Sequence, residues 1–116
     1  RQRQMCIRDS KYIRDNPKVI QAWTDVVARA EKYVKDTPAA TLTPQIMTFF
    51  PGMDQGAVTE AIERYKQYQI WKTSPLVTAE AMAKLQDMLV ASAVMKETAR
   101  VKYEDVVVAD FAKKVP

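Results

Sequence analysis

The sequence has no histidine, one cysteine and two glycines among its 116 residues. Because histidine is the most common general base and metal ligand, Ser-His and Cys-His nucleophile arrangements are excluded. Neither Gly52 nor Gly56 lies in a GxGxxG or Walker-type loop, so no phosphate-binding loop is encoded. The longest apolar stretches, such as Leu89 to Met95, fall far short of the roughly 20 residues that a transmembrane helix needs. We therefore expect no catalytic, metal or cofactor site in this chain and no enzymatic activity.

The first ten residues differ in character from the rest. Residues 1–10, RQRQMCIRDS, resemble translated adapter sequence of the kind found at the ends of contaminated assemblies, and the alternative is a native polar arm. We therefore divide the chain into this segment and a body over residues 11–116. Cys6 lies in the segment, so the body has no thiol for disulfide, zinc or nucleophilic chemistry.

The basic excess of the chain depends partly on the same segment. The whole chain has 18 Lys and Arg against 14 Asp and Glu, a net charge of +4. Without Arg1, Arg3, Arg8 and Asp9 the counts become 15 and 13, a net charge of +2. Because binding to a phosphate backbone needs a concentrated set of basic contacts, we expect no nucleic-acid partner.

Helix signals dominate the body. Asn16-Pro17 predicts the start of a long helix, which should stop near Asp36-Thr37-Pro38 because proline disfavours the helical conformation of the residue before it. Thr43-Pro44 predicts a shorter helix that ends at Pro51-Gly52. Asp54 and Thr78 can then cap a third and a fourth helix. The fold expected of the chain as it stands is all-α, with four main helices and a short C-terminal element.

Each main helix has an apolar face. Trp71, in the segment after the third helix, is expected to fill a groove between helices. Residues 101–108 are β-branched but do not alternate, which favours a short helix or an extended tail. The residues expected to face inward are Val19, Ile20, Trp23, Val26, Val27, Ala30, Tyr33 and Val34 in the first helix, Val58, Ala61, Ile62 and Tyr65 in the third, and Met82, Leu85, Leu89 and Val94 or Ala93 in the fourth.

Three groups of residues could carry chemistry or binding. The carboxylate pairs Glu60 with Glu63 and Glu104 with Asp105 could serve in acid-base work if buried, but a solvated helix face is the more common role. Aromatic side chains can stack on bases or on a ring ligand, and methionines can line an adaptable groove, although core packing explains both groups more simply. The aromatic residues are Trp23, Tyr33, Tyr65, Tyr68 and Trp71, and the methionines are Met47, Met53, Met82, Met88 and Met95.

A series of short motifs runs through the body in a set order. It begins with Tyr12-Ile13 and Asn16-Pro17, passes through the helix from Ala22 to Val34, and reaches Phe50-Pro51-Gly52-Met53-Asp54. The later motifs are Arg64-Tyr65-Lys66, Ile70-Trp71, Pro75, Val77-Thr78, Leu85-Gln86-Asp87, Tyr103-Glu104 and Phe111-Ala112-Lys113-Lys114. In this order the motifs resemble the C-terminal helical section of the substrate-binding proteins of ABC importers for nitrate, taurine, aliphatic sulfonates and pyrimidine precursors.

The resemblance implies a larger parent protein. Members of that family have two α/β lobes, the type II periplasmic-binding-protein fold, which close without chemistry on a small anionic or heterocyclic ligand. The lobe strands and most ligand contacts would precede Lys11, so no ligand-binding residue is assigned in this chain. The resemblance further implies a periplasmic or extracellular membrane-anchored protein, monomeric when intact, that delivers its small-molecule ligand to a membrane permease.

Some positions depart from the family pattern. Gln69 stands where a glycine often precedes Ile-Trp, Ala93 replaces a frequent helix-ending glycine, and Val108 replaces a common aspartate. Thr43-Pro44 also interrupts what is often a continuous helix.

Two other functions stay open. The amphipathic helices could form a free-standing interaction module that binds protein or nucleic acid. An enzyme with the same two-lobed architecture could act on a pyrimidine precursor, with its histidines upstream of Lys11. If the chain is a part of the larger protein, its apolar helix faces have no strands to cover, and we expect exposed apolar surface and marginal stability.

Overall fold

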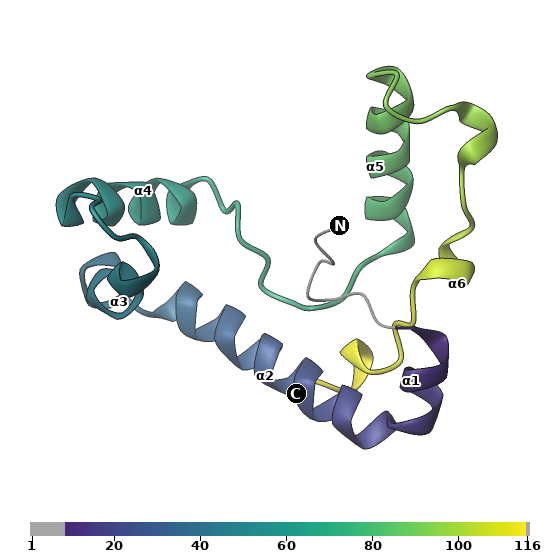
Figure 1. Ribbon diagram of the computed structural model, residues 1–116, viewed down its shortest axis with the longest axis horizontal. Coiled ribbons are helices and arrows are strands. Elements are labelled where there is room, and N and C mark those ends of the chain that lie inside the picture. The colour runs from purple at the N-terminus through teal and green to yellow at the C-terminus, as the bar shows by residue number, and fades with distance from the viewer. Residues whose placement is uncertain (1–8, 116) are drawn as a thin grey trace. The chain divides into compact units, whose positions relative to one another are not determined.

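The computed structural model describes residues 9–115, and all of the regular structure in that range is helical, which confirms the all-α expectation (Figure 1). Short 3-10 turns lie at Met47–Phe49, Glu97–Ala99 and Ala112–Lys114. The α-helices are α1 (Ser10–Asp15), α2 (Pro17–Asp36), α3 (Ala39–Ile46), α4 (Gln55–Gln67), α5 (Ala79–Ala91) and α6 (Tyr103–Val106).

Three of the four main helices begin where the capping residues predict. α2 starts at Pro17 and ends at Asp36, directly before Thr37-Pro38. The carboxylate of Asp54 accepts a hydrogen bond from the backbone N–H of Ala57 at 2.9 Å, which caps α4. The hydroxyl of Thr78 accepts one from the backbone N–H of Ala81 at 3.1 Å, which caps α5. Each cap gives a partner to an N–H that the helix itself cannot satisfy.

The prediction that the second main helix starts at Thr43-Pro44 is wrong. α3 begins four residues earlier, at Ala39, and Pro44 lies inside it. Proline inside a helix removes one hydrogen bond and crowds the preceding turn. The gain comes from packing, because the early start places Ala39 and Leu42 in the core, each only 5% exposed. Tertiary packing therefore outweighs the local preference of proline.

A short helix, α1, precedes α2 and was not predicted. It starts at Ser10, and the carboxylate of Asp9 accepts a hydrogen bond from the backbone N–H of Tyr12 at 2.8 Å. The side chain of Asn16 donates to the carbonyl of Tyr12 at 3.3 Å, which gives a partner to a carbonyl near the end of α1. Asp9 and Ser10 belong to the adapter-like segment, and Cys6 lies outside the described residues.

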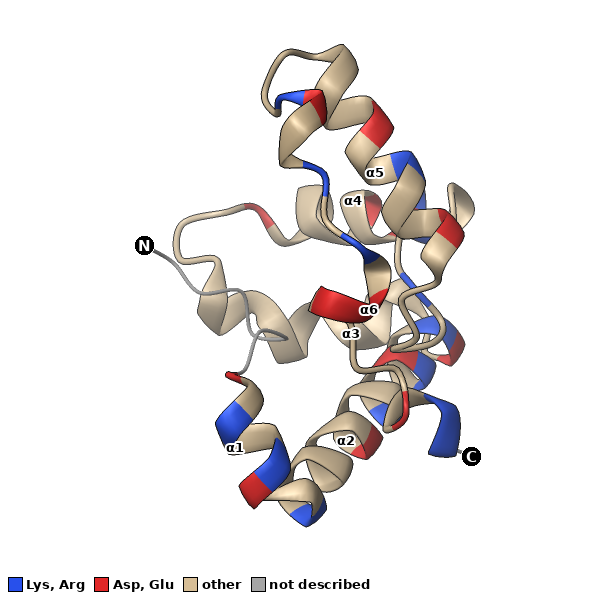
Figure 2. Cartoon of the chain, turned by 90° about the vertical axis from the view of Figure 1, so that its right-hand side faces the viewer, with Lys and Arg blue, Asp and Glu red and all other residues tan. Residues whose placement is uncertain are grey.

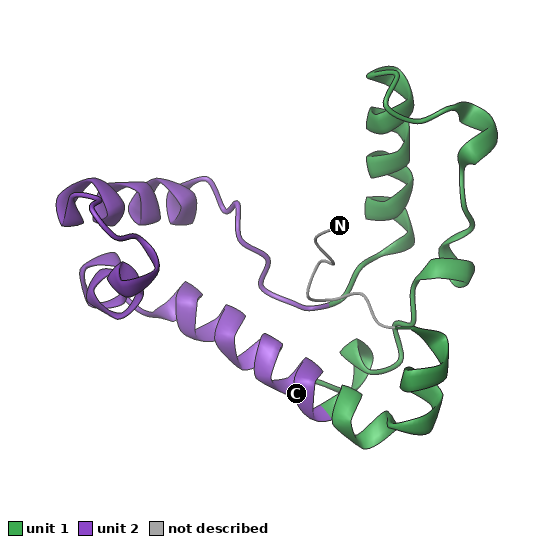
Figure 3. Cartoon of the chain, viewed as in Figure 1, with its two compact units in different colours: residues 1–21, 76–116 green, residues 22–75 purple. Residues whose placement is uncertain are grey.

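The chain divides into two compact units (Figure 3). Unit 1 comprises residues 1–21 and 76–116, and unit 2 comprises residues 22–75. Unit 2 contains the hydrophobic core of the described chain, where α3 packs against α4. The buried core residues are Ala39, Leu42, Val58 and Ile62, with Val34, Ile46 and Met47 half-buried against them.

A pair of hydroxyl groups joins α3 to α4 inside unit 2. Thr43 is fully buried, and its Oγ1 lies 2.9 Å from the Oγ1 of Thr59. Each hydroxyl also lies 2.9 Å from a carbonyl of its own helix, that of Ala39 or that of Gln55. The buried Thr43 hydroxyl is therefore satisfied, as buried polar groups must be.

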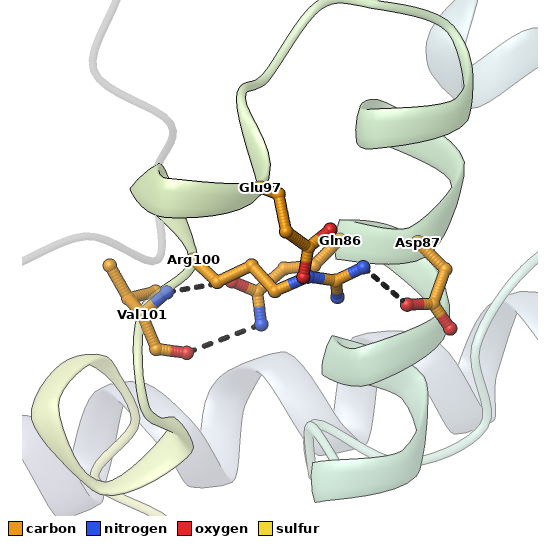
Figure 4. A network of polar contacts seen from close by, with 5 residues as sticks. All are labelled: Gln86, Asp87, Glu97, Arg100 and Val101. Carbon is orange, nitrogen blue, oxygen red and sulfur yellow. Dashed lines mark hydrogen bonds and ion pairs between the residues drawn. The ribbon is translucent and has the colours of Figure 1, made fainter.

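In unit 1, hydrogen bonds and ion pairs connect α5 and the residues just before it to the segment that follows α5. The side-chain amide of Gln86, 8% exposed, accepts from the N–H of Val101 at 2.8 Å and donates to its carbonyl at 3.2 Å (Figure 4). Arg100 forms ion pairs with Asp87 at 2.8 Å and with Glu97 at 2.5 Å. The hydroxyl of Tyr103 donates to the carbonyl of Val77 at 2.6 Å. The contacts of Gln86 and Asp87 join the segment after α5 to that helix, and the Tyr103 contact joins it to the residue two positions before α5. α6 is a short helix, one of the two alternatives expected for residues 101–108.

Several residues expected in the interior are exposed. Trp23 is 40% exposed and Leu85 is 45% exposed, so neither lies in the buried core. In the described part of the chain, nineteen large apolar or aromatic residues are exposed, whereas the buried hydrophobic core has four members. The other inward predictions that fail are Val19, Val26, Ala30, Tyr33, Ala61, Tyr65, Ala93 and Val94.

Two helices end in a left-handed residue that is not glycine. At the end of α4, Gln69 has φ +52°, its N–H donates to the carbonyl of Lys66, and the N–H of Ile70 donates to that of Tyr65. This pair of bonds is the Schellman motif, in which glycine is strongly favoured at the left-handed position.

The end of α5 repeats this arrangement. Ala93 has φ +57°, and the N–H groups of Ala93 and Val94 donate to the carbonyls of Val90 and Leu89 at 2.9 and 3.0 Å. Gln69 and Ala93 are the non-glycine residues with positive φ in the part of the chain that the structure describes. A side chain at such a position costs roughly 1–2 kcal/mol.

The core of unit 2 gives a first prediction. Leu42→Ala removes a buried side chain from the α3–α4 contact and should cost about 2–5 kcal/mol in free energy of unfolding. The measurement is urea denaturation followed by tryptophan fluorescence, since Trp23 and Trp71 both lie in unit 2. Phe49→Ala is the control, because Phe49 is 78% exposed and its truncation should change stability by less than about 0.5 kcal/mol. Equal effects of the two substitutions would contradict this placement of the core.

The left-handed positions give a second prediction. Ala93→Gly relieves the strain at φ +57° but loosens the unfolded chain, so we expect a net gain of about 0.5–1 kcal/mol in stability. Gln69→Gly should act in the same direction. Ala83→Gly, within α5, is the control and should cost about 1 kcal/mol. Thermal melts followed by circular dichroism measure the stability of all three variants. A loss of stability in Ala93→Gly would contradict the left-handed conformation of residue 93.

Candidate functional site

The residue groups considered from the sequence do not assemble into a reactive centre. Glu60, Glu63, Glu104 and Asp105 are exposed, and Glu60 pairs with Arg64 at 2.5 Å. Within residues 9–115, no three side chains of the acidic, histidine or cysteine type converge as metal ligands would. None of the helices in this range has the length and apolar character that crossing a bilayer requires.

The aromatic and methionine groups are dispersed. Of the five aromatics, Tyr65 and Trp71 come together, with ring centroids 5.5 Å apart and planes at 81°. Tyr33 instead exchanges hydrogen bonds with Gln45 through its hydroxyl. All five are exposed to some degree rather than packed in a core, contrary to the simpler interpretation. Met47, Met82 and Met95 are half-buried, whereas Met53 and Met88 are exposed.

The candidate site is a pocket inside unit 2 with a volume of about 460 Å³. That volume falls within the range of about 300–1,000 Å³ that small-molecule sites occupy. The last turns of α2 and α4 and the segment after α4 form its walls. The lining residues are Glu31, Val34, Lys35, Tyr65, Lys66, Gln69, Trp71, Lys72 and Thr73.

Lys66 ties α4 to the end of α2. Its ammonium group donates to the carbonyl of Lys35 at 3.0 Å and to the carbonyl of Thr37. Helix carbonyls at a C-terminus have no partner within the helix and carry partial negative charge, which favours a cation there. The ammonium group of Lys66 therefore already has two hydrogen-bond partners, both of them backbone carbonyls.

Glu31 is the acidic residue that lines the pocket. Its Oε2 is shielded from solvent and has no hydrogen-bond partner among the described residues. Burial raises the pKa of the Glu31 carboxyl above its ordinary value, and the nearby charge of Lys72 partly opposes that rise. An unpartnered, desolvated carboxylate is unfavourable, so the ionised form of Glu31 costs stability in this fold.

The aromatic wall depends on the end of α4. The left-handed Gln69 turns the chain after the helix, and Trp71 then lies edge-to-face against Tyr65. The expectation that Trp71 fills a groove between helices is met in part. It lines the pocket between α2 and α4, yet 38% of it stays exposed.

Glu31, Lys35 and Lys72 were not predicted as site residues. A signal for Glu31 was present, because it lies four residues after Val27 and three before Val34, on the half-buried face of α2. Lys35 and Lys72 had no such signal, since a lysine at a helix end or in a loop is usually solvated. Their common location follows from the packing of unit 2.

Three comparisons, with models of known protein families, with curated proteins and with solved structures, find no match to the chain.

The environment of Glu31 gives a third prediction. The pKa of Glu31 is higher in the folded chain than in the unfolded chain, where it has its ordinary value of 4.5. The protonated Glu31 side chain therefore makes its full contribution to stability below pH 4.5, and this contribution is lost as the pH rises through the folded-state pKa. Glu31→Gln removes that loss, so the variant should melt at a higher temperature than the parent near pH 7 and at the same temperature at low pH. Glu63→Gln, at an exposed position of α4, is the matched control and should show no such pH dependence. A lower melting temperature for Glu31→Gln near pH 7 would contradict the assignment.

Proposed function

We propose that the chain is the C-terminal helical section of the substrate-binding subunit of an ABC importer for a small anionic or heterocyclic solute of the nitrate, taurine, sulfonate or pyrimidine-precursor type. The observation that carries the proposal is the backbone at Gln69 and Ala93. The family resemblance places frequent glycines at these two positions, and both residues have the positive φ that favours glycine. Sequence resemblance and backbone conformation therefore agree at two independent helix ends.

The distribution of apolar side chains also supports the proposal. A four-residue core in unit 2 is small for a chain of this length, while large side chains such as Trp23, Val26 and Leu85 stay exposed. Monomeric soluble proteins rarely expose much contiguous apolar surface, and such surface commonly marks an interface. In the proposed parent, the helices would cover the α/β lobes and bury these side chains.

The role of this section in transport would be that of a scaffold. Two lobes of the parent would close on the solute outside the cytoplasmic membrane and deliver it to the permease, with no bond made or broken. The intact subunit would be a monomer, periplasmic or anchored at the outer face of the membrane. The ligand contacts would lie mainly in the lobes.

A free-standing module that binds another protein is the second candidate, because exposed apolar helix faces also suit a protein partner. Nucleic acid is a less suitable partner. Figure 2 shows basic and acidic residues interspersed along the helices, and Lys11, Lys32, Arg64 and Lys84 are each paired with an acidic residue four positions away. Interspersed charges provide no basic stripe for a phosphate backbone.

The fourth prediction separates the two candidates. In the 116-residue chain, Trp23→Ala and Leu85→Ala should each cost less than about 1 kcal/mol, because both side chains are well exposed. In the protein extended by the sequence encoded upstream of Lys11, the same substitutions should cost about 2–5 kcal/mol, because the lobes would bury them. Urea denaturation followed by circular dichroism measures both backgrounds.

Equally small costs in the two backgrounds would count against the transport proposal, as would upstream sequence without alternating strands and helices. The control is Lys18→Ala, a charged and exposed residue of α2, which should be neutral in both. A thermal-shift screen of the extended protein with nitrate, taurine, alkanesulfonates and pyrimidine precursors then identifies the ligand class.

A further inference from the structure

We propose that the pocket of unit 2 binds a small zwitterion with a flat apolar group, of the kind represented by an aromatic amino acid. All the residues that line the pocket lie within unit 2, in the span 22–75. The pocket therefore needs no residue from outside unit 2, and the proposal does not rest on the transport function.

The charges at the pocket select the ligand class. Glu31, Lys35 and Lys72 all line the pocket, and neither lysine has an ion-pair partner within 4.0 Å in the part of the chain described. Lys66 lies beside them, but its ammonium group already bonds to two backbone carbonyls. A simple anion would meet Glu31, and a simple cation would meet the two lysines. A molecule that carries both charges can pair with both signs at once.

The shielded oxygen of Glu31 favours an incoming donor. Oε2 has no hydrogen-bond partner among the described residues, and an unsatisfied buried acceptor requires an explanation. An ammonium group of the ligand would supply the missing N–H as the carboxyl group turns toward it. The carboxylate of the same ligand would then lie toward Lys72, whose charge already acts on Glu31.

The aromatic pair accounts for the flat apolar part. Tyr65 and Trp71 both line the pocket, meet edge-to-face, and are 46% and 38% exposed, so part of each residue remains open to contact with a third ring. Aromatic rings gain free energy beyond simple burial when they stack in offset or edge-to-face geometry. Val34 adds an apolar contact from α2.

The test uses three ligands that share one ring and differ in charge. These are L-phenylalanine, which carries both charges, phenylacetate, which is an anion, and 2-phenylethylamine, which is a cation. The protein is the full 116-residue chain with Trp23→Phe, so that Trp71 is the single tryptophan and its fluorescence reports on the pocket. L-phenylalanine should saturate the signal and bind at least about tenfold more tightly than either partner, since one hydrogen bond to a charged group is worth that factor.

Two variants assign the contacts. Glu31→Gln should reduce the preference for L-phenylalanine over phenylacetate, and Lys72→Gln should reduce its preference over 2-phenylethylamine. Lys84→Gln, which removes an exposed lysine of α5 in unit 1, should leave all three affinities unchanged. Circular dichroism spectra check that each variant keeps its helix content.

The proposal is overturned if L-phenylalanine gives no saturable change in Trp71 fluorescence, or if phenylacetate or 2-phenylethylamine binds as tightly. It is also overturned if Lys84→Gln weakens binding as much as Lys72→Gln does. These readouts differ from the denaturation and upstream-sequence tests of the transport function, so each proposal can fail alone.

Discussion

The contact between α3 and α4 is the interaction on which the described core depends. Leu42 of α3 and the pair Val58 and Ile62 of α4 exclude water from one small cluster, and the Thr43 and Thr59 hydroxyls meet beside it. Apolar burial of this kind is the main favourable term in folding. It also explains why α3 accommodates Pro44, because a helix that began at Thr43 would leave Ala39 and Leu42 outside it. Local preference yields to packing at this point.

Away from that contact, much of the chain is held by polar and local interactions. The side-chain amide of Gln86 accepts from the N–H of Val101 and donates to its carbonyl. Ion pairs on the helices, such as Lys11 with Asp15 and Lys84 with Glu80, are exposed. Exposed ion pairs contribute little to stability, about 0–1 kcal/mol each. Only a small part of the described chain therefore gains stability from the burial of apolar side chains in a core. Burial of the exposed apolar residues against another surface would supply the rest, and this is the physical argument for the proposal that the helices belong to a larger protein.

The residues that line the pocket of unit 2 have different structural roles. Lys66 satisfies the carbonyls at the end of α2, and Gln69 turns the chain so that Trp71 returns to Tyr65. Glu31 and Lys72 have opposite charges and both line the pocket. Burial raises the pKa of the Glu31 carboxyl group, and the charge of Lys72 partly opposes that rise. A site with both signs of charge and an aromatic wall is thus a by-product of how two helix ends meet.

The sequence by itself determined the all-α class, the bounds of α2, and the capped starts of α4 and α5, because caps and prolines act within a few residues of one another. It could not determine which apolar residues are buried: Trp23 and Leu85 have the same periodicity as buried residues, and only the partner of a helix face decides its exposure. The start of α3, the burial of Gln86 and the gathering of Glu31, Lys35 and Lys72 were decided by tertiary structure. Each depends on contacts between residues far apart in the chain, and a local pattern does not encode them.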